Sequence, residues 1–234
     1  DVTISVLAKD TTNQLKAMGG AGGVAAGSSV EAASDMTVTA LVEFLNGTGS
    51  NHAAVSAPGR DILVNTRTDT TAKVFGQIKF TVDGLSSLST DVKNTMNIAS
   101  TVNLGAYTEL SAGNDLSIAA LIGSIYALAS AYSETGSIIN TQSRPTAEVN
   151  VTAKAWIRGA ENAKLSAANL LSLVAATAEN NNIYTKAYSY GFTAGGTGSV
   201  VSKAVNNTKL YGQIDILGDQ SELHGKDIYV SASA

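Results

Sequence analysis

The stretch ELSAGNDLSIAA, Glu109 to Ala120, decides the fold, because related phrases recur along the whole 234-residue chain. Each copy consists of a short segment, a turn, and a second segment in which apolar residues alternate with small or polar ones. The copies are AVSAPGRDILVNT (54–66), ELSAGNDLSIAA (109–120), KLSAANLLSLVAA (164–176) and ELHGKDIYVSASA (222–234), and DVTISVLA (1–8) matches the second half. Internal repetition of this kind is typical of solenoids.

The residue after each turn gives the length of the repeating unit. Aligned there are Asp1, Asp61, Asp115, Leu170 and Asp227, which are 60, 54, 55 and 57 residues apart. The unit is therefore about 57 residues long. We expect units at approximately 1–60, 61–114, 115–169 and 170–226, with 227–234 as the start of the next.

Apolar residues with a period of two follow each turn, which predicts strands that bury one row of side chains. The copies differ in length only at the turn, so we expect the strands to stack in register while the corners vary. We expect the aspartates to accept hydrogen bonds from turn N–H groups. The predicted turn-forming residues are Gly59, Asp61, Gly113, Asp115, Gly225 and Asp227.

The sequence thus predicts an all-β fold, a right-handed parallel β-helix or β-solenoid, as a single domain over residues 1–234. Only Pro58 and Pro145 interrupt the capacity of the backbone to form hydrogen-bond ladders. On length, a 57-residue unit is too long for one coil. We expect three coils per unit, or two larger ones, giving a rod about 40 to 60 Å long at about 4.8 Å per coil.

Composition excludes several classes of protein. The net charge is −4 without a basic stripe, which argues against nucleic acid as a partner. The longest apolar candidate, 116–132, is shorter than a membrane-spanning helix and contains several serines, so we expect no membrane span. Cysteine is absent, which excludes disulfides and thiolate zinc sites. The chain begins at Asp1, and we expect a processed chain or a segment of a longer polypeptide.

The phrases SAGNDLSIAA, GRDILVNT, GKDIYVSA and AKDTTNQLKAMGGAGGVAAGSSVEA (8–32) resemble the repeat regions of the large secreted filamentous adhesins of Gram-negative bacteria, haemagglutinin-like and leukotoxin-like. With the intervening strands, this resemblance covers nearly the whole chain. It implies a parallel β-helix shaft at the cell surface or released from it. The sequence departs from the pattern at Leu170, where the other copies have Asp.

No motif in the sequence predicts a catalytic, cofactor or metal site. The Gly-rich run 19–29 lacks the Lys and the spacing of a phosphate-binding loop, and indicates close packing. We expect no calcium site at the turn aspartates, because they lie about 57 residues apart in sequence. His52 and His224 lack the neighbours that a metal site needs, apart from Glu222 beside His224. The charged residues are scattered singly, so we expect no enzymatic activity and no cofactor.

Two groups of residues are candidates for contact with other molecules. We expect a contact surface at Trp156 and Arg158 and at the tyrosine cluster Tyr184, Tyr188 and Tyr190. Three sequons predict possible glycosylation sites of an exported protein, at Asn46, Asn150 and Asn206.

Two functions follow as hypotheses. The first is a structural component of an extracellular filament or adhesin stalk that mediates surface attachment or cell–cell and matrix assembly. Its partners are further copies of itself end to end, or the continuation of a longer chain, with glycans or a host or neighbouring cell surface as targets. The alternative is a carbohydrate-binding or polysaccharide-cleaving β-helix that uses the tyrosine cluster and Trp156.

Overall fold

The structure, a computed structural model, describes the backbone of residues 1–20, 23–79, 82–216 and 218–234, and their side chains except at 23–26, 82–86, 139–140, 178–179 and 197. In these residues all secondary structure is β. The strands are β1 (Val2–Gly19), β2 (Gly23–Phe44), β3 (Ala53–Ala57), β4 (Ile62–Ile78), β5 (Val82–Leu104), β6 (Thr108–Ala112), β7 (Leu116–Gly159), β8 (Lys164–Ala167), β9 (Leu170–Thr193), β10 (Thr197–Val200), β11 (Lys203–Ile216), β12 (Glu222–His224) and β13 (Asp227–Ser233).

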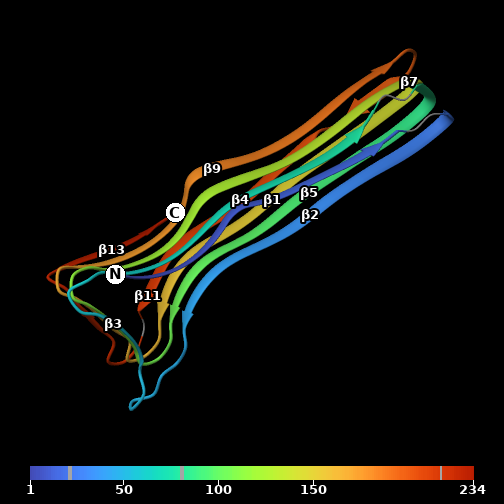
Figure 1. Ribbon diagram of the computed structural model, residues 1–234. Coiled ribbons are helices and arrows are strands. Elements are labelled where there is room, and N and C mark those ends of the chain that lie inside the picture. The colour runs from blue at the N-terminus through green and yellow to red at the C-terminus, as the bar shows by residue number, and fades with distance from the viewer. Residues whose placement is uncertain (21–22, 80–81, 217) are drawn as a thin grey trace.

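Each repeat forms one coil, which follows a long path out, a long path back and a short path across the base (Figure 1). The outgoing strands are β1, β4, the first part of β7, and β9; β13 begins a fifth. The returning strands are β2, β5, the second part of β7, and β10 with β11. The base strands are β3, β6, β8 and β12. Each coil pairs in parallel with the next along all three faces.

The register gives a correction to the predicted coil length. Val2 pairs with Ile62, Ile62 with Leu116, Leu116 with Leu171, and Leu171 with Ile228, so successive coils are one whole repeat apart. The all-β parallel solenoid is confirmed, but two or three coils per repeat is wrong, because the long strands reach 22 residues in β2 and 24 in β9.

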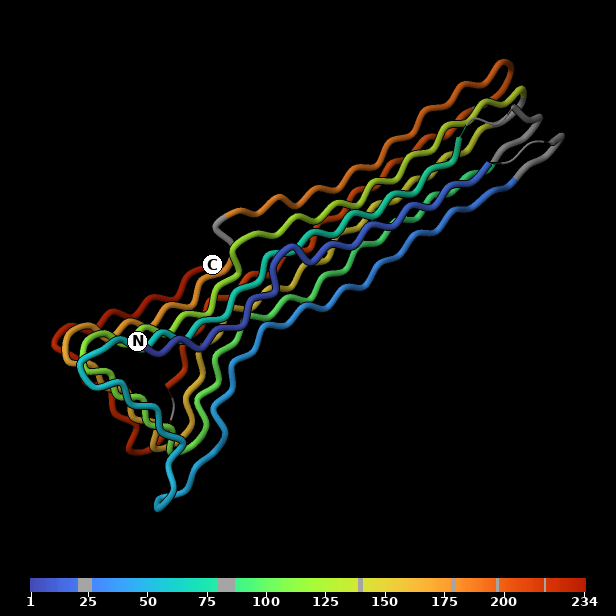
Figure 2. The backbone as a smooth tube through the Cα atoms, viewed as in Figure 1, coloured from blue at the N-terminus to red at the C-terminus, as the bar shows by residue number. Residues whose placement is uncertain are grey.

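The molecule is therefore a blade and not a thin rod (Figure 2). At about 4.8 Å per coil the stack is only about 20 Å thick, against the expected 40 to 60 Å. The long dimension runs along the strands, and is about 70 Å for a strand such as β2.

Small side chains explain why two long sheets lie so close together. The inner face of the blade carries Ala72, Gly76, Ala129 and Ala131, all buried. A Cβ added to Gly76 would lie 2.5 Å from Cγ2 of Val92 on the opposite sheet. Nearer the base the interior widens, and Leu, Ile and Val fill it in one continuous cluster. The excess of Ala, Gly, Ser and Thr in the sequence is thus a requirement of thin packing.

Pro145 lies where pairing with the fourth coil is interrupted. It pairs with Thr90 on one side. On the other side β10 ends opposite Ser143 and β11 begins opposite Thr146. The missing N–H of proline fits a break in the ladder at this point.

Register shifts recur at one level of the outgoing face. They lie between Ala8 and Thr11 in β1, between Thr68 and Asp69 in β4, and at Gly123 in β7. β-Bulges bend the strands that carry them, and the outgoing strands bend together partway along the blade (Figure 2).

Candidate functional site: turn ladders and outer faces

The turn aspartates connect each coil to the next. The Asp61 carboxylate accepts a hydrogen bond of 3.2 Å from the backbone N–H of Asp115, and the Asn114 amide donates to the same oxygen at 2.6 Å. The Asp115 carboxylate accepts in turn from the N–H of Leu170 at 3.1 Å, and Asp1 accepts from the N–H of Asp61 at 3.4 Å. The carboxylates thus accept hydrogen bonds from turn N–H groups of the following coil, so each of these coils supplies an acceptor to the next.

Leu170 lacks the carboxylate that accepts from the next coil elsewhere, but the backbone N–H of Asp227 still has an acceptor. The Asp227 N–H donates to the backbone carbonyl of Asn169 at 2.9 Å, where the other coils use a carboxylate. The Asn169 side chain extends the column by donating to the Asn114 amide oxygen. A backbone carbonyl therefore replaces the missing acid.

The predicted turn glycines are needed for different reasons. Gly59 has a φ of 69°, in the left-handed region that disfavours a Cβ. A Cβ on Gly113 would lie 1.8 Å from the Gly59 nitrogen, so these turns stack backbone on backbone. At Gly225 a Cβ would lie 2.8 Å from the Asp227 carbonyl oxygen.

The Asp61 ladder predicts an acid sensitivity. Hydrogen bonds from the Asn114 amide and the Asp115 N–H hold the Asp61 pKa below its ordinary 3.8. A lowered folded pKa stabilises the fold above the unfolded pKa, and this contribution is lost as pH falls through the lower folded value. We expect the melting temperature of the wild-type chain to fall more between about pH 6 and about pH 3 than that of Asp61→Asn, which keeps the acceptor oxygen without titrating. Thermal melts followed by circular dichroism measure this, and equal falls in both proteins would contradict it.

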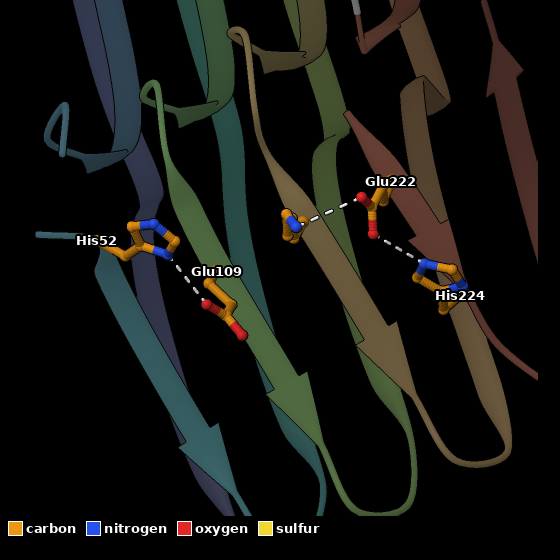
Figure 3. Close-up of polar contacts among 5 residues, drawn as sticks. His52, Glu109, Glu222 and His224 are labelled. Atoms are coloured by element: carbon orange, nitrogen blue, oxygen red, sulfur yellow. Dashed lines mark hydrogen bonds and ion pairs between the residues drawn. The ribbon is translucent and has the colours of Figure 1, made fainter. Parts of the chain in front are cut away.

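A column of charged side chains crosses the base face (Figure 3). Lys164 of β8 pairs in register with Glu109 of β6 and Glu222 of β12, and its ammonium lies 3.3 Å from a Glu222 oxygen. The other Glu222 oxygen lies 3.1 Å from His224, and His224 and Lys164 together lower the Glu222 pKa. These groups are exposed, so salt screens the column and it stabilises the fold little.

His52 has a charged partner that its neighbours in the sequence do not reveal. Its Nδ1 lies 3.1 Å from the Glu109 carboxylate (Figure 3), and its ring lies 5.9 Å from that of Tyr107. The partner is 57 residues away in sequence and one coil away in space. The sequence did not indicate this partner, because spatial neighbours in a one-coil repeat are about 57 residues apart in sequence.

Trp156 and Arg158 lie on the outer face of the returning strands, beside a hollow of about 860 Å³. The indole N–H donates to Asp215 at 2.8 Å. The Lys154 ammonium lies 3.3 Å from the ring centroid, and the Arg158 guanidinium carbon lies 5.4 Å from it. The ring already has cationic partners of its own, so it is not a free platform for stacking.

The tyrosine cluster lies on the opposite outer face. Tyr184, Tyr188 and Tyr190 alternate with inward-facing residues along β9 and are exposed. Parallel register places aromatic side chains of β4 and β7 beside them; Tyr132 pairs with Tyr188, for example. We call this surface the aromatic strip, and it comprises Phe75, Tyr126, Tyr132, Tyr184, Tyr188, Tyr190 and Phe192. The structure therefore separates the five predicted contact residues into two faces.

The other members of the strip were missed in the sequence because they are scattered in it. Tyr132 lies 56 residues before Tyr188, and Phe75 lies 55 before Ser130. Extending the repeat alignment from the turns along the whole strands would have brought them together. That step needs the knowledge that one repeat is one coil.

The three sequons differ in their surroundings. Asn46 and Asn206 are exposed, and Asn46 accepts a hydrogen bond of 2.9 Å from the Ala106 N–H. Asn150 is half-buried; its amide donates to Glu148 at 2.6 Å and its oxygen accepts from Asn207 at 2.9 Å. At Asn150 a glycan would be attached to the nitrogen that donates to Glu148. Glycosylation remains a prediction at all three sites.

The reason given for excluding calcium at the turns was wrong in part. Asp1, Asp61 and Asp115 are adjacent in space, since each lies one coil from the next, whereas Leu170 separates Asp115 from Asp227. One oxygen of each of these three carboxylates accepts from a turn N–H group, and among the described side chains no three His, Cys, Asp or Glu residues gather as metal ligands do. Likewise, no helix in the described ranges is long and apolar enough to cross a membrane.

The comparisons with known proteins add no relative. No protein-family model matches the sequence, and neither a curated protein nor a solved structure does. The likeness to filamentous adhesins therefore rests on the repeat phrases alone.

Proposed function

We propose that this chain is a structural segment of an extracellular filament or adhesin stalk at the cell surface. The observation that carries the proposal is the interchangeable coil. Every coil presents the same three faces, and Asp or Asn at each turn is placed to hold the next one. Coils of this kind can be added to a stack or removed from it without changing the contacts within the remaining coils. A stalk whose length is set by its number of repeats needs this property.

Both faces at the ends of the stack support the same conclusion. Ile228 and Val230 continue an apolar column that is buried in the inner coils, yet they are 50% and 53% exposed. At the other end Val6 and Leu15 are partly exposed on β1. Uncovered strand edges with apolar side chains pair readily with further strands. Another coil, from the same polypeptide or from a second copy, would cover them.

The proposal predicts that two copies joined in register form one stack. Residues 227–234 match residues 1–8, so the test protein consists of residues 1–226 followed directly by residues 1–234. We expect a blade about twice as thick and a higher melting temperature than the single chain, because nearest-neighbour interfaces stabilise repeat proteins.

Negative-stain electron microscopy and thermal melts measure both quantities. A control in which a flexible Gly-Ser linker joins two complete chains keeps the composition but does not impose the register. If the in-register fusion gives two separate blades that melt like the single chain, continued stacking is contradicted.

The aromatic strip favours carbohydrate binding as a second candidate function. Its side chains point outward from β4, β7 and β9, so they remain accessible when further coils stack on the edge of β9.

A further inference from the structure

The aromatic strip has an arrangement that suits a long, flat ligand. The Tyr126 and Tyr184 rings lie 6.0 Å apart between neighbouring coils, and Tyr132 and Tyr188 are direct register partners. Along β9, alternate residues repeat at about 7 Å. The rings thus extend in two directions over one sheet, which offers a surface and not an enclosed cavity.

Lysines interleave with these rings. The Lys73 ammonium lies 4.9 Å from the Tyr126 ring centroid, and that of Lys186 lies 6.0 Å from Tyr184. Lys16 shares a register row with Phe75. Within the part of the chain that the structure describes, none of the three lysines has a carboxylate oxygen within 4.0 Å.

Glu134 is the acidic residue beside these rings, and it accepts a hydrogen bond from one of them. The Tyr132 hydroxyl donates to Glu134 at 3.1 Å, and burial together with that carboxylate raises the Tyr132 pKa. The Glu134 carboxylate keeps its charge, but Lys16, Lys73 and Lys186 outnumber it, so the strip is locally cationic on a chain whose net charge is −4. Local charge of the opposite sign to the whole chain favours an anionic ligand at this place.

We infer that the aromatic strip on β4, β7 and β9 binds an acidic polysaccharide, with sugar rings on the tyrosines and carboxylates or sulfates on Lys73 and Lys186. A sugar ring has an apolar face that packs on an exposed aromatic ring, and its hydroxyls can form hydrogen bonds with the tyrosine hydroxyls. A polymer matches a surface without a cavity. The lysines argue against a protein partner, because lysine is depleted in the desolvated centre of protein interfaces.

This inference specifies the second candidate function above, and its test is separate from that of stacking. The probes are polygalacturonate and heparin, with methyl-esterified polygalacturonate as the uncharged form of the first. We expect the 234-residue chain to bind at least one acidic polymer, more weakly as salt rises, and to bind the esterified polymer at least about tenfold more weakly.

The variants locate the binding on the strip. Tyr188→Ala combined with Tyr190→Ala is expected to weaken binding at least about tenfold. Lys73→Gln combined with Lys186→Gln is expected to weaken it similarly and to flatten its salt dependence. The matched controls are Tyr211→Ala and Lys209→Gln on the returning face, where Tyr211 is 46% exposed against 55% for Tyr188, and both are expected to bind like the wild type.

Isothermal titration calorimetry measures the affinities, and circular dichroism melts verify that each variant is folded. Absence of binding to both acidic polymers overturns the inference. So does binding that the strip variants leave unchanged, or that the controls on the returning face reduce equally. Binding of the wild-type chain to anionic lipid vesicles, without binding to either polymer, assigns the strip to membranes and also overturns it.

Discussion

Replacing Gly113 by alanine is expected to lower the free energy of unfolding by about 3 kcal/mol and the melting temperature by about 10 °C. The added Cβ would lie 1.8 Å from the Gly59 nitrogen and 2.6 Å from its Cα. Both are backbone atoms, so no side-chain rotation relieves the clash. The turns of the two coils must therefore move apart. This movement strains the hydrogen bond of 2.8 Å from the Gly113 N–H to the Ala57 carbonyl, and the bond from the Asp115 N–H to the Asp61 carboxylate two residues later.

Two matched variants separate stacking from the general cost of replacing glycine. Gly20→Ala introduces the same methyl group where nothing lies within 4 Å, and we expect a change below about 0.5 kcal/mol. Gly59→Ala meets no atom either but imposes a left-handed φ of 69°, and we expect a loss of about 1 kcal/mol. Chemical denaturation of the three variants gives the ranking. A loss at Gly113 no larger than that at Gly59 would contradict backbone-on-backbone stacking of the turns.

The sequence predicted the fold class because the relevant signals are local. The alternation of apolar and polar residues in segments such as 116–120 indicates strands, and Gly and Asp indicate the turns between them. Neither signal requires knowledge of contacts that are distant in sequence. The coil length was not local information. It depends on whether two long sheets pack against each other over their full length, and that depends on small residues such as Gly76 and Ala131 facing one another across the interior.

The same limit explains the outcome for the candidate surfaces. Tyr184, Tyr188 and Tyr190 are close in sequence, and their clustering was visible there. Their neighbours Tyr126 and Tyr132 belong to the strip only through register with the preceding coil. Once one repeat is known to form one coil, a residue of an inner coil has two spatial neighbours, about 57 positions before and after it in sequence. Pairs such as His52 and Glu109 then become predictable.

The column Ile62, Leu116, Leu171 and Ile228 provides the second large effect. Leu116 is fully buried between neighbours in the coils on both sides, so Leu116→Ala is expected to cost about 3 kcal/mol. Ile228 occupies the corresponding position of the last coil, where only Leu171 pairs with it and half of its surface is exposed. Ile228→Ala is therefore expected to cost less than about 1 kcal/mol.

The contrast between these two variants, measured by chemical denaturation, tests which coil is the end of the stack. It also links stability to the proposed assembly, because an end coil becomes an inner coil when another stacks on it. If single chains associate end to end, the cost of Ile228→Ala should rise with protein concentration towards that of Leu116→Ala. Equal costs at every concentration, down to dilutions at which sedimentation shows only single chains, would contradict an uncovered position for Ile228. If the costs instead differ at high dilution and converge as concentration rises, Ile228 contributes most of its stabilisation after assembly, as part of the surface on which the next coil stacks.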